Sequence, residues 1–430
     1  MKNTILLTIS FISISVFGQQ RQDSLSFKLD QYFTALTDIN NFNGNVIVAK
    51  DNKIFLNKTY NIKDANESLK VNKHSKFIIA SVAKVFIKFS ILKLVEKNRL
   101  QLDDKLSKFI PDFPNGDKIT IEQLMYHKSG LPRVLTDYEK HDNLTMEKVV
   151  ELAKQEKLQF EPNSNTLYSN IGFSLLHYII QKSSKKGYPK FTEDLLKSMN
   201  LKNTFEYNNK NKLQNLASGF ETEEGKIIPS SKKDIKRFET GIYYSTILDM
   251  YNFSEQMLSD KILKKSLSIK MFEQDSTLKQ TGGITGYRAY FYKNLKTKVT
   301  FIFLSNFTDI SIQEVTTDIV NLIDKKPYEI PKRINRIRII LEDTVLKRYV
   351  GKYSLEADYN QTFTVVIENN KLFIIDKSGG KAEMIPDTET TFFIEPKSKN
   401  GYSFLLNPQT KKYDLTIIST GLKLKTKRVE

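Results

Sequence analysis

The spacing of apolar residues changes along the chain and predicts two domains of different class. Apolar residues three or four positions apart predict helices at 81–98, 121–127, 146–157, 171–184 and 313–323. Apolar runs bounded by turn residues predict strands at 45–49, 53–56, 287–292 and 298–306. Strands at both ends with helices between them indicate an α+β domain, built as one antiparallel sheet flanked by helices.

A different pattern begins after residue 326. Pro327, Pro331 and the basic run 332–336 are typical of a linker, which we place at 327–340. Residues 341–430 contain short strand-like segments separated by turns, and they predict a small all-β barrel or sandwich. These segments are 362–368, 371–376, 391–395, 402–406 and 412–418.

Residues 1–18 have the features of a secretory signal peptide. One positive charge, at Lys2, precedes an apolar run over 5–17 that is too short to span a bilayer comfortably, and Val16-Phe17-Gly18 offers small residues for cleavage. We expect cleavage before Gln19, export to the periplasm or beyond, and a first folded domain over 19–326. An uncleaved anchor or a buried N-terminal helix is the alternative.

The composition bounds the chemistry. The absence of cysteine among the 430 residues excludes disulfides, thiolate nucleophiles and cysteine-based metal sites. The net charge of +17 is spread along the chain without a basic stripe, which argues against nucleic acid and leaves only a weak attraction to an anionic envelope open. The four histidines lack metal-ligand spacing, so we predict no metal and no cofactor. The oligomeric state is left open.

Ser81 and Lys84 are a candidate nucleophile and base, because they place a hydroxyl and an amine on one face of a helix. A neutral lysine can activate a serine hydroxyl. Only Ser81 among six such pairs follows an apolar approach, 77–80, and opens a long helix, where free backbone N–H groups favour an oxyanion. A helix-capping serine beside a solvent-facing lysine is the alternative. The other pairs are Ser90/Lys93, Ser183/Lys186, Ser230/Lys233, Ser276/Lys279 and Ser378/Lys381.

Two further segments carry suitable chemistry. The Tyr168 phenol could shuttle a proton beside a lysine, and the Asn170 amide could hold a substrate carbonyl. In the glycine-rich segment 281–287, Gly282 and Gly283 would let a substrate approach the backbone, and one N–H there could complete an oxyanion hole. Taken alone, this segment is more simply read as a flexible turn.

In this order the three motifs resemble the serine β-lactamase and penicillin-binding-protein-like superfamily, whose Ser-x-x-Lys, Tyr-x-Asn and Lys/His-x-Gly elements follow the same sequence. Four longer stretches are similar to its class C branch, which includes esterases and D-aminopeptidase-type enzymes: 77–84, 124–132, 160–173 and 244–249. The resemblance covers about 30–325. The segment that begins at Tyr349-Val350-Gly351 resembles the lipocalin-like β-domain often appended to such hydrolases; shaping the site entrance, oligomerisation and a spacer role are all open for it.

The resemblance implies a role for each matching residue. Ser81 would be acylated, Lys84 would act as base in acylation, and Tyr168 would pass the proton to the leaving group and later activate water. Asn170 would position the substrate carbonyl or amide, and the backbone N–H groups of Ser81 and Gly283 would form the oxyanion hole. His127 is a tempting triad base, but its family element is structural.

Gln280 departs from the family pattern. Lysine or histidine usually stands there, and Lys279, one residue away, would point to the other face of the strand. A cation at this position ordinarily binds a substrate carboxylate and lowers the pKa of the catalytic lysine or tyrosine, whereas Gln280 can only hydrogen-bond. We therefore expect poor turnover of β-lactams and carboxylate-terminated peptides, and either a preference for neutral esters or amides or reduced activity.

The sequence thus supports an exported serine hydrolase that acts on a small-molecule or peptide substrate through an acyl-enzyme. The alternative is a non-catalytic, penicillin-binding-protein-like module that binds cell-wall peptide or a protein partner, as Gln280 and the extra β-domain suggest. Fold kinship does not identify the substrate, because pocket loops decide it.

Overall fold

The computed structural model describes residues 24–430 apart from 64–65, 138–139, 141–143, 208–212, 224–225, 232–240, 357, 378, 397–399 and 420–421. The expected signal peptide, residues 1–18, lies outside the described residues. The chain divides into two compact units, Asn40–Ile310 and a second that joins the residues up to Ile39 with Ser311–Glu430. None of the helices described is long and apolar enough to cross a membrane.

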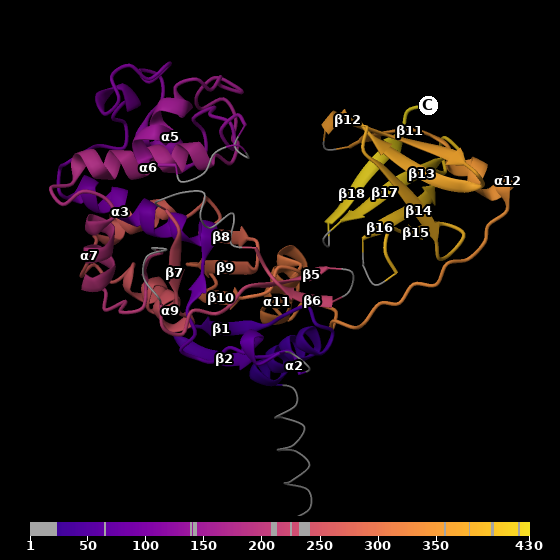
Figure 1. Cartoon of the computed structure of the whole chain (residues 1–430), viewed down its shortest axis with the longest axis horizontal. Coiled ribbons are helices and arrows are strands. Elements are labelled where there is room, and N and C mark those ends of the chain that lie inside the picture. The colour runs from indigo at the N-terminus through magenta and orange to yellow at the C-terminus, as the bar shows by residue number, and fades with distance from the viewer. Residues whose placement is uncertain are drawn as a thin grey trace, which may run out of the picture. The chain divides into compact units, whose positions relative to one another are not determined.

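A five-stranded antiparallel sheet forms the centre of the first unit, in the order β2-β1-β10-β9-β8 (Figure 1). The first strand of the unit, β1, pairs with its last strand, β10, and Gly44 lies opposite Ser305. The strands predicted at both ends of the domain therefore share one sheet. This confirms the α+β class and the antiparallel sheet. The strands are β1 (Gly44–Lys50), β2 (Lys53–Tyr60), β8 (Thr277–Ile284), β9 (Tyr287–Asn294) and β10 (Val299–Ser305).

Helices cover this sheet and share its core. Helix α6 (Asn170–Ser183) packs against both α3 (Lys84–Glu96) and α5 (Met146–Ala153) (Figure 1). Each predicted helix is present, and the observed ends lie within two residues of the predicted ones except for α5, which ends at Ala153 and not at residue 157. The other helices of this unit are α4 (Ile121–Met125), α7 (Lys190–Ser198), α9 (Ile247–Gln256) and α10 (Lys265–Ser268).

Helix α3 is held in the centre of the unit by aromatic packing. Phe253 of α9 lies edge-on to Phe86 and Phe89 of α3, with ring centroids 4.9 and 5.5 Å away, and also contacts Phe291 of β9 at 6.1 Å. All four rings are buried. Since each such pair contributes about 0.5–1.5 kcal/mol beyond burial, this cluster fixes the position of α3 against the sheet.

A second, three-stranded sheet, in the order β3-β7-β4, leads into α3. It consists of β3 (Phe77–Ile78), β4 (Phe205–Glu206) and β7 (Tyr243–Ser245), and a separate hairpin joins β5 (Phe220–Glu223) to β6 (Lys226–Pro229). Directly after β3, the Ile79 N–H donates to the Tyr243 carbonyl over 3.0 Å. The chain is therefore fixed to the second sheet directly before the turn that follows.

The second unit contains a closed eight-stranded barrel, which confirms the predicted all-β domain. Aromatic rings fill its interior: Tyr349 stacks on Phe404 at 4.2 Å, and Phe392 meets Phe404 edge-on at 5.6 Å. The strands are β11 (Gly351–Leu355), β12 (Asp358–Glu368), β13 (Lys371–Asp376), β14 (Lys381–Pro386), β15 (Thr391–Phe393), β16 (Gly401–Leu406), β17 (Tyr413–Ser419) and β18 (Leu422–Arg428), preceded by α12 (Asp343–Leu346). In the same unit α2 (Leu25–Asp38) packs against α11 (Ile312–Ile323), and Tyr32 Oη donates to Asp318 Oδ2 over 2.9 Å.

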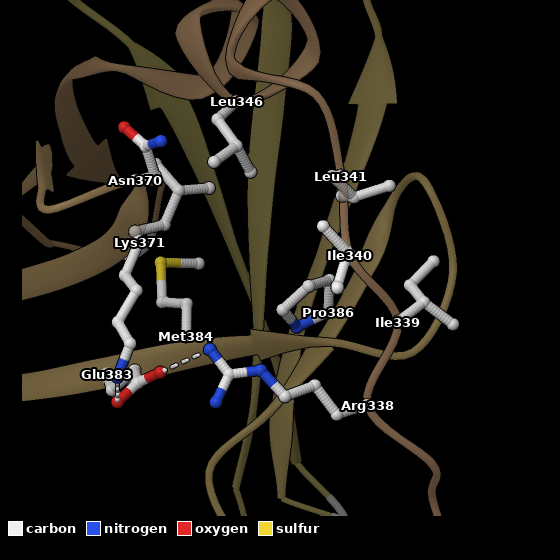
Figure 2. A pocket seen from close by; sticks show the side chains of 11 residues that line it. Arg338, Ile339, Ile340, Leu341, Leu346, Asn370, Lys371, Glu383, Met384 and Pro386 are labelled. Atoms are coloured by element: carbon white, nitrogen blue, oxygen red, sulfur yellow. Dashed lines mark hydrogen bonds and ion pairs between the residues drawn. The ribbon is translucent and has the colours of Figure 1, made fainter.

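One small hollow lies beside the barrel, between residues 338–341 and strands β13 and β14 (Figure 2). Its volume is about 60 Å³, and the Arg338–Glu383 ion pair, 3.2 Å long, closes one side. A few water molecules fit in such a space, whereas a drug-sized ligand needs several hundred Å³. The hollow therefore offers no ligand site of the lipocalin kind.

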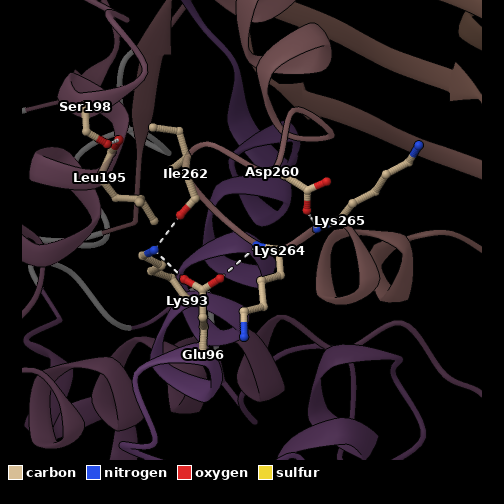
Figure 3. Close-up of polar contacts among 8 residues, drawn as sticks. All are labelled: Lys93, Glu96, Leu195, Ser198, Asp260, Ile262, Lys264 and Lys265. Atoms are coloured by element: carbon tan, nitrogen blue, oxygen red, sulfur yellow. Dashed lines mark hydrogen bonds and ion pairs between the residues drawn. The ribbon is translucent and has the colours of Figure 1, made fainter.

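Buried polar contacts anchor the C-terminal end of α3 (Figure 3). The Lys93 ammonium contacts both the Glu96 carboxylate and the Ile262 carbonyl, and the Lys264 N–H donates to Glu96 Oε1 over 2.8 Å. The Lys93 and Glu96 side chains are only 19% and 17% exposed. Burial raises the pKa of Glu96, but the hydrogen bonds and charges of Lys93 and Lys264 outweigh it and hold this pKa below its ordinary value.

We expect Glu96→Gln to lower the free energy of unfolding by about 1–3 kcal/mol at neutral pH, because a charged acceptor with two partners becomes a neutral one. Since the pKa of Glu96 is lowered on folding, its contribution is present above an unfolded pKa of about 4.3 and is lost as the pH falls through the folded value. Urea titrations at several pH values measure this. The matched control is Glu151→Gln, which breaks an exposed pair with Lys148 and should change stability by less than about 1 kcal/mol; equal effects at both positions would contradict the prediction.

Candidate active site

Ser81 lies in a strained turn at the entrance to α3. The turn is a short 3₁₀ helix, Ala80–Ala83, so the expected helix of residues 81–98 starts more tightly wound than predicted. Ala80 has φ +44°, a left-handed conformation that is uncommon for any residue except glycine. Such backbone strain persists only where the surrounding structure imposes it, and it concentrates at functional sites. The strained residue directly precedes Ser81, whose side chain is half-buried.

Lys84 lies one turn further and contacts two of the predicted site residues. Its Nζ is 3.1 Å from Ser81 Oγ and donates to Asn170 Oδ1 over 2.9 Å. A neutral amine has two N–H groups and one lone pair, so Asn170 can take one N–H while the lone pair accepts the Ser81 proton. Burial lowers the pKa of Lys84; Tyr168 opposes this shift and the charge of Arg133 adds to it. The neutral, basic form of Lys84 is thereby favoured.

Tyr168 completes the group. Its ring centroid is 5.0 Å from Lys84 Nζ. The segment that carries it is tied down by backbone and hydroxyl contacts: the Asn170 N–H donates to the Arg133 carbonyl over 2.8 Å, and Ser169 Oγ donates to the Pro132 carbonyl over 2.8 Å. Ser169 also caps α6 by accepting from the Gly172 N–H, at 3.0 Å. The same capping motif therefore starts the helix and fixes Tyr168 and Asn170 beside Lys84.

His127 positions this segment. Its Nδ1 accepts the Ser169 N–H over 3.1 Å, and its ring packs 4.5 Å from that of Tyr168 and 5.1 Å from that of Phe173. Burial, with the nearby charges of Lys88 and Lys84, lowers the pKa of His127 to about 3. A neutral ring whose Nδ1 already accepts a hydrogen bond supports the structural reading of His127 and not the triad base.

Strand β8 runs past the turn that holds Ser81. A Cβ on Gly282 would lie 2.3 Å from the Ile79 carbonyl oxygen, so glycine is needed for the strand to come this close. Because β8 is the edge strand, alternate backbone N–H groups on its outer side have no partner within the sheet. The neighbouring Gly283, opposite Arg288 in the sheet register, thus lies on the edge strand that passes the turn holding Ser81, and its role in an oxyanion hole stays a prediction. The segment 281–287, read from the sequence as a flexible turn, contains the end of strand β8, a two-residue turn at Thr285-Gly286 and the first residue of β9.

Gln280 places no cation on this edge. Its side chain is half-buried and its Nε2 donates to the Thr281 carbonyl over 2.9 Å. Lys279 is exposed and lies 3.6 Å from Glu273 Oε2, as expected for the opposite strand face. The charge that the family usually provides from this strand is therefore absent from it.

Two cations near the site were missed by the sequence reasoning. The Arg133 guanidinium lies 5.1 Å from the Tyr168 ring centroid, and Lys88 lies under the Tyr126 ring at 5.4 Å, where burial lowers its pKa to about 8. Arg133 directly follows the 124–132 stretch, and this adjacency was the available signal. Within the described part of the chain, no three histidine, aspartate or glutamate residues group so as to hold a metal ion.

Comparison with known proteins settles the family. The family profile described as Beta-lactamase matches residues 29–314. The chain belongs to the beta-lactamase family. Penicillin-binding protein 4* of Bacillus subtilis is 24% identical over 416 residues, 86% of this chain and 92% of that protein. Among solved structures, that of the octameric penicillin-binding protein homologue from Pyrococcus abyssi matches with a TM-score of 0.62 at 19% identity, over 93% of this chain and 99% of that one.

A second solved structure, the D-amino acid amidase from Ochrobactrum anthropi SV3, matches with a TM-score of 0.58 at 17% identity, over 69% of this chain and 99% of that one. These likenesses in structure show the fold. The resemblance to the serine β-lactamase and penicillin-binding-protein-like superfamily is confirmed.

Proposed function

We propose that the protein is an exported serine hydrolase that cleaves an ester or amide through an acyl-enzyme on Ser81. The observation that carries this proposal is the position of Lys84 Nζ, 3.1 Å from Ser81 Oγ and 2.9 Å from Asn170 Oδ1, in a buried setting that lowers its pKa. Residues 1–18 support export, because they have the features of a signal peptide.

Acylation follows from this geometry. Ser81 Oγ attacks the substrate carbonyl while its proton passes to Lys84 Nζ, and the carbonyl oxygen becomes an oxyanion held by the N–H groups of Ser81 and Gly283. The bond to the leaving group then breaks, and the proton held by Lys84 reaches the leaving oxygen or nitrogen through the Tyr168 hydroxyl. The products are the acyl-enzyme and a neutral alcohol or amine.

Deacylation reverses these roles. A water molecule attacks the acyl carbon and gives one proton through the Tyr168 hydroxyl to Lys84 Nζ, and Ser81 Oγ leaves with that proton returned from Lys84. The enzyme returns to its starting state, and one ester or amide bond has been hydrolysed. No cofactor takes part in these steps.

For the substrate class we propose D-amino-acid derivatives or cell-wall peptides. The proposal rests on kinship with penicillin-binding protein 4* and with a D-amino acid amidase, together with export. A panel of short-chain esters, D-aminoacyl amides, D-Ala-D-Ala peptides and a chromogenic cephalosporin, compared by kcat/KM, would separate the possibilities. Each D-aminoacyl amide is compared with its L-enantiomer. Equal kcat/KM for the two enantiomers would contradict a D-amino-acid specificity.

A fluorophosphonate probe tests the nucleophile directly. We expect it to label the full-length mature protein once, and mass spectrometry of the digested adduct to place the phosphonyl group on the peptide that contains Ser81. Heat-denatured protein is the control and should not label. Labelling on another serine, or no labelling of folded protein, would contradict the proposed nucleophile.

A non-catalytic binding module is the second candidate, favoured by the lack of a cation at Gln280 on β8. Such a protein would bind cell-wall peptide without releasing product. Stoichiometric binding of peptide with no labelling by the probe and no hydrolysis in the panel would establish this reading in place of the first.

A further inference from the structure

A cation does lie beside the predicted catalytic residues. It comes from Arg133 in the loop that follows α4, and not from strand β8. The Arg133 guanidinium carbon lies 5.1 Å from the ring centroid of Tyr168, and the same ring centroid is 5.0 Å from Lys84 Nζ. Arg133 and Lys84 therefore both border the residue that, in the proposed mechanism, hands the proton to the leaving group. The preference for neutral substrates was expected because Gln280 on strand β8 has no charge, and Arg133 supplies a charge from a different segment.

The backbone of Arg133 is rigidly placed. Its carbonyl accepts the Asn170 N–H over 2.8 Å, and the preceding Pro132 carbonyl accepts Ser169 Oγ over 2.8 Å. The guanidinium also lies over the Tyr168 ring at a distance typical of a cation–π contact. A guanidinium that is already held in place loses little side-chain entropy when it pairs with an anion. Arg133 is therefore well suited to bind an anionic group of a substrate.

The other cations around the site are committed elsewhere. Lys88 is buried under the Tyr126 ring, and Lys279 is turned toward Glu273 on the opposite strand face. Arg288 is half-buried and its Nη1 donates to the Ile284 and Tyr287 carbonyls, each over 2.9 Å. By contrast Arg133 is exposed, and among the residues described no carboxylate lies within ion-pair distance of it. Its charge is available to a ligand.

We infer that Arg133 is a specificity-determining residue that binds a carboxylate on the leaving-group side of the substrate. The inference rests on the proposed function, since it assigns Tyr168 to the leaving group. Arginine and carboxylate match in a two-point geometry, which gives direction as well as charge. The preferred substrates then carry an acidic group one short spacer beyond the bond that is cleaved, although Gln280 supplies no charge.

Two aryl acetates that differ only in a masked carboxylate test this inference: 4-acetoxybenzoate, whose leaving group is an anion, and its methyl ester, methyl 4-acetoxybenzoate. Acetate release from each ester is followed for the wild type, Arg133→Gln and Arg133→Lys. The pH is chosen high enough that kcat/KM no longer changes with pH in any of the three proteins. We expect Arg133→Gln to lower the ratio of kcat/KM for the acid over that for the methyl ester about tenfold, and Arg133→Lys to keep most of this ratio. The ratio is the readout because Arg133 also affects Lys84, which acts on both substrates alike.

The matched control is Lys128→Gln, which removes one charge from the same loop at an exposed position. We expect this variant to keep the ratio within about twofold of the wild type. If any positive charge in this loop were enough to favour the acid, Lys128→Gln would lower the ratio as well. If the wild type hydrolyses the methyl ester and the ratio is the same in Arg133→Gln, the inference is wrong and the proposed function stands. If both rates fall equally, Arg133 acts only through Tyr168 and Lys84, which also overturns carboxylate binding. If the wild type cleaves neither ester and does not label with the fluorophosphonate, the proposed function itself fails, and the inference with it.

Discussion

Replacing Lys84 by methionine is expected to lower kcat/KM for ester hydrolysis about 10³-fold or more while the protein remains folded. Methionine fills a similar volume but cannot accept the Ser81 proton, and general bases typically contribute factors of 10²–10⁴. Burial of a lysine also carries a desolvation cost, so the variant should unfold at the same or a higher temperature than the wild type. Steady-state kinetics and thermal melting on the same preparation measure both effects.

The double variant Ser81→Ala/Lys84→Met sharpens this test. If the two residues act as one unit, the double variant should be no slower than Ser81→Ala alone, because removal of either group already abolishes the shared step. Lys88→Met is the matched control, since Lys88 lies one turn along the same helix, is also largely buried, and has no contact with Ser81 or Asn170. A loss from Lys88→Met as large as from Lys84→Met would mean that positive charge near the site matters more than the base.

The pH dependence gives an independent signature of Lys84. Deprotonated lysine is the active form, so kcat/KM should rise with pH and level off above the pKa of Lys84. Burial lowers this pKa, with Tyr168 opposing and Arg133 adding to the shift, so the rising limb should lie below the ordinary lysine value of about 10.4. Since Arg133 helps to lower the pKa, Arg133→Gln should move the limb to higher pH. A limb at the ordinary value in the wild type would contradict a buried base.

The sequence predicted much of the fold because hydrophobic spacing reports burial. The hairpin at 45–56, the strands near 290 and 300 and the barrel segments all appear, since each has a buried face that its pattern reveals. Strand β8 was harder to predict, because Thr281 to Gly283 have no apolar side chains to mark a face. Its strand geometry is imposed by pairing with β9 and by the close approach to Ile79.

The site was predictable where chemistry and spacing coincide. Ser81 and Lys84 lie one helical turn apart, so their contact follows from the helix, and Tyr168 and Asn170 follow from a helix start with Ser169 as its cap. Arg133 has no such signature. Its position beside Tyr168 depends on two backbone contacts between segments 35 or more residues apart, which no local pattern encodes.

Gly282→Ala is expected to lower kcat/KM and the rate of fluorophosphonate labelling about 100-fold. The new Cβ would lie 2.3 Å from the Ile79 carbonyl oxygen and 3.2 Å from the Val82 nitrogen, and these are backbone atoms that cannot rotate away. Ile79 is also held from behind, because its N–H donates to the Tyr243 carbonyl. Strand β8 must therefore move outward, which widens the oxyanion hole between Ser81 and Gly283, and a displacement near 1 Å is enough for a loss of this size.

Gly172→Ala is the control that separates this effect from the general cost of adding a methyl group. A Cβ on Gly172 would find its nearest neighbour, Leu124, at 3.6 Å, which is ordinary contact, and alanine is favoured over glycine within a helix by about 0.5–1 kcal/mol. This variant should be as active as the wild type and slightly more stable to urea. If Gly282→Ala retained activity within about threefold of wild type while its melting temperature fell, the strand would be able to yield without disturbing the site, and the proposed oxyanion hole would have to lie elsewhere. Loss of labelling in a folded Gly282→Ala protein, beside full labelling in Gly172→Ala, locates the effect at the contact between β8 and the turn that carries Ser81.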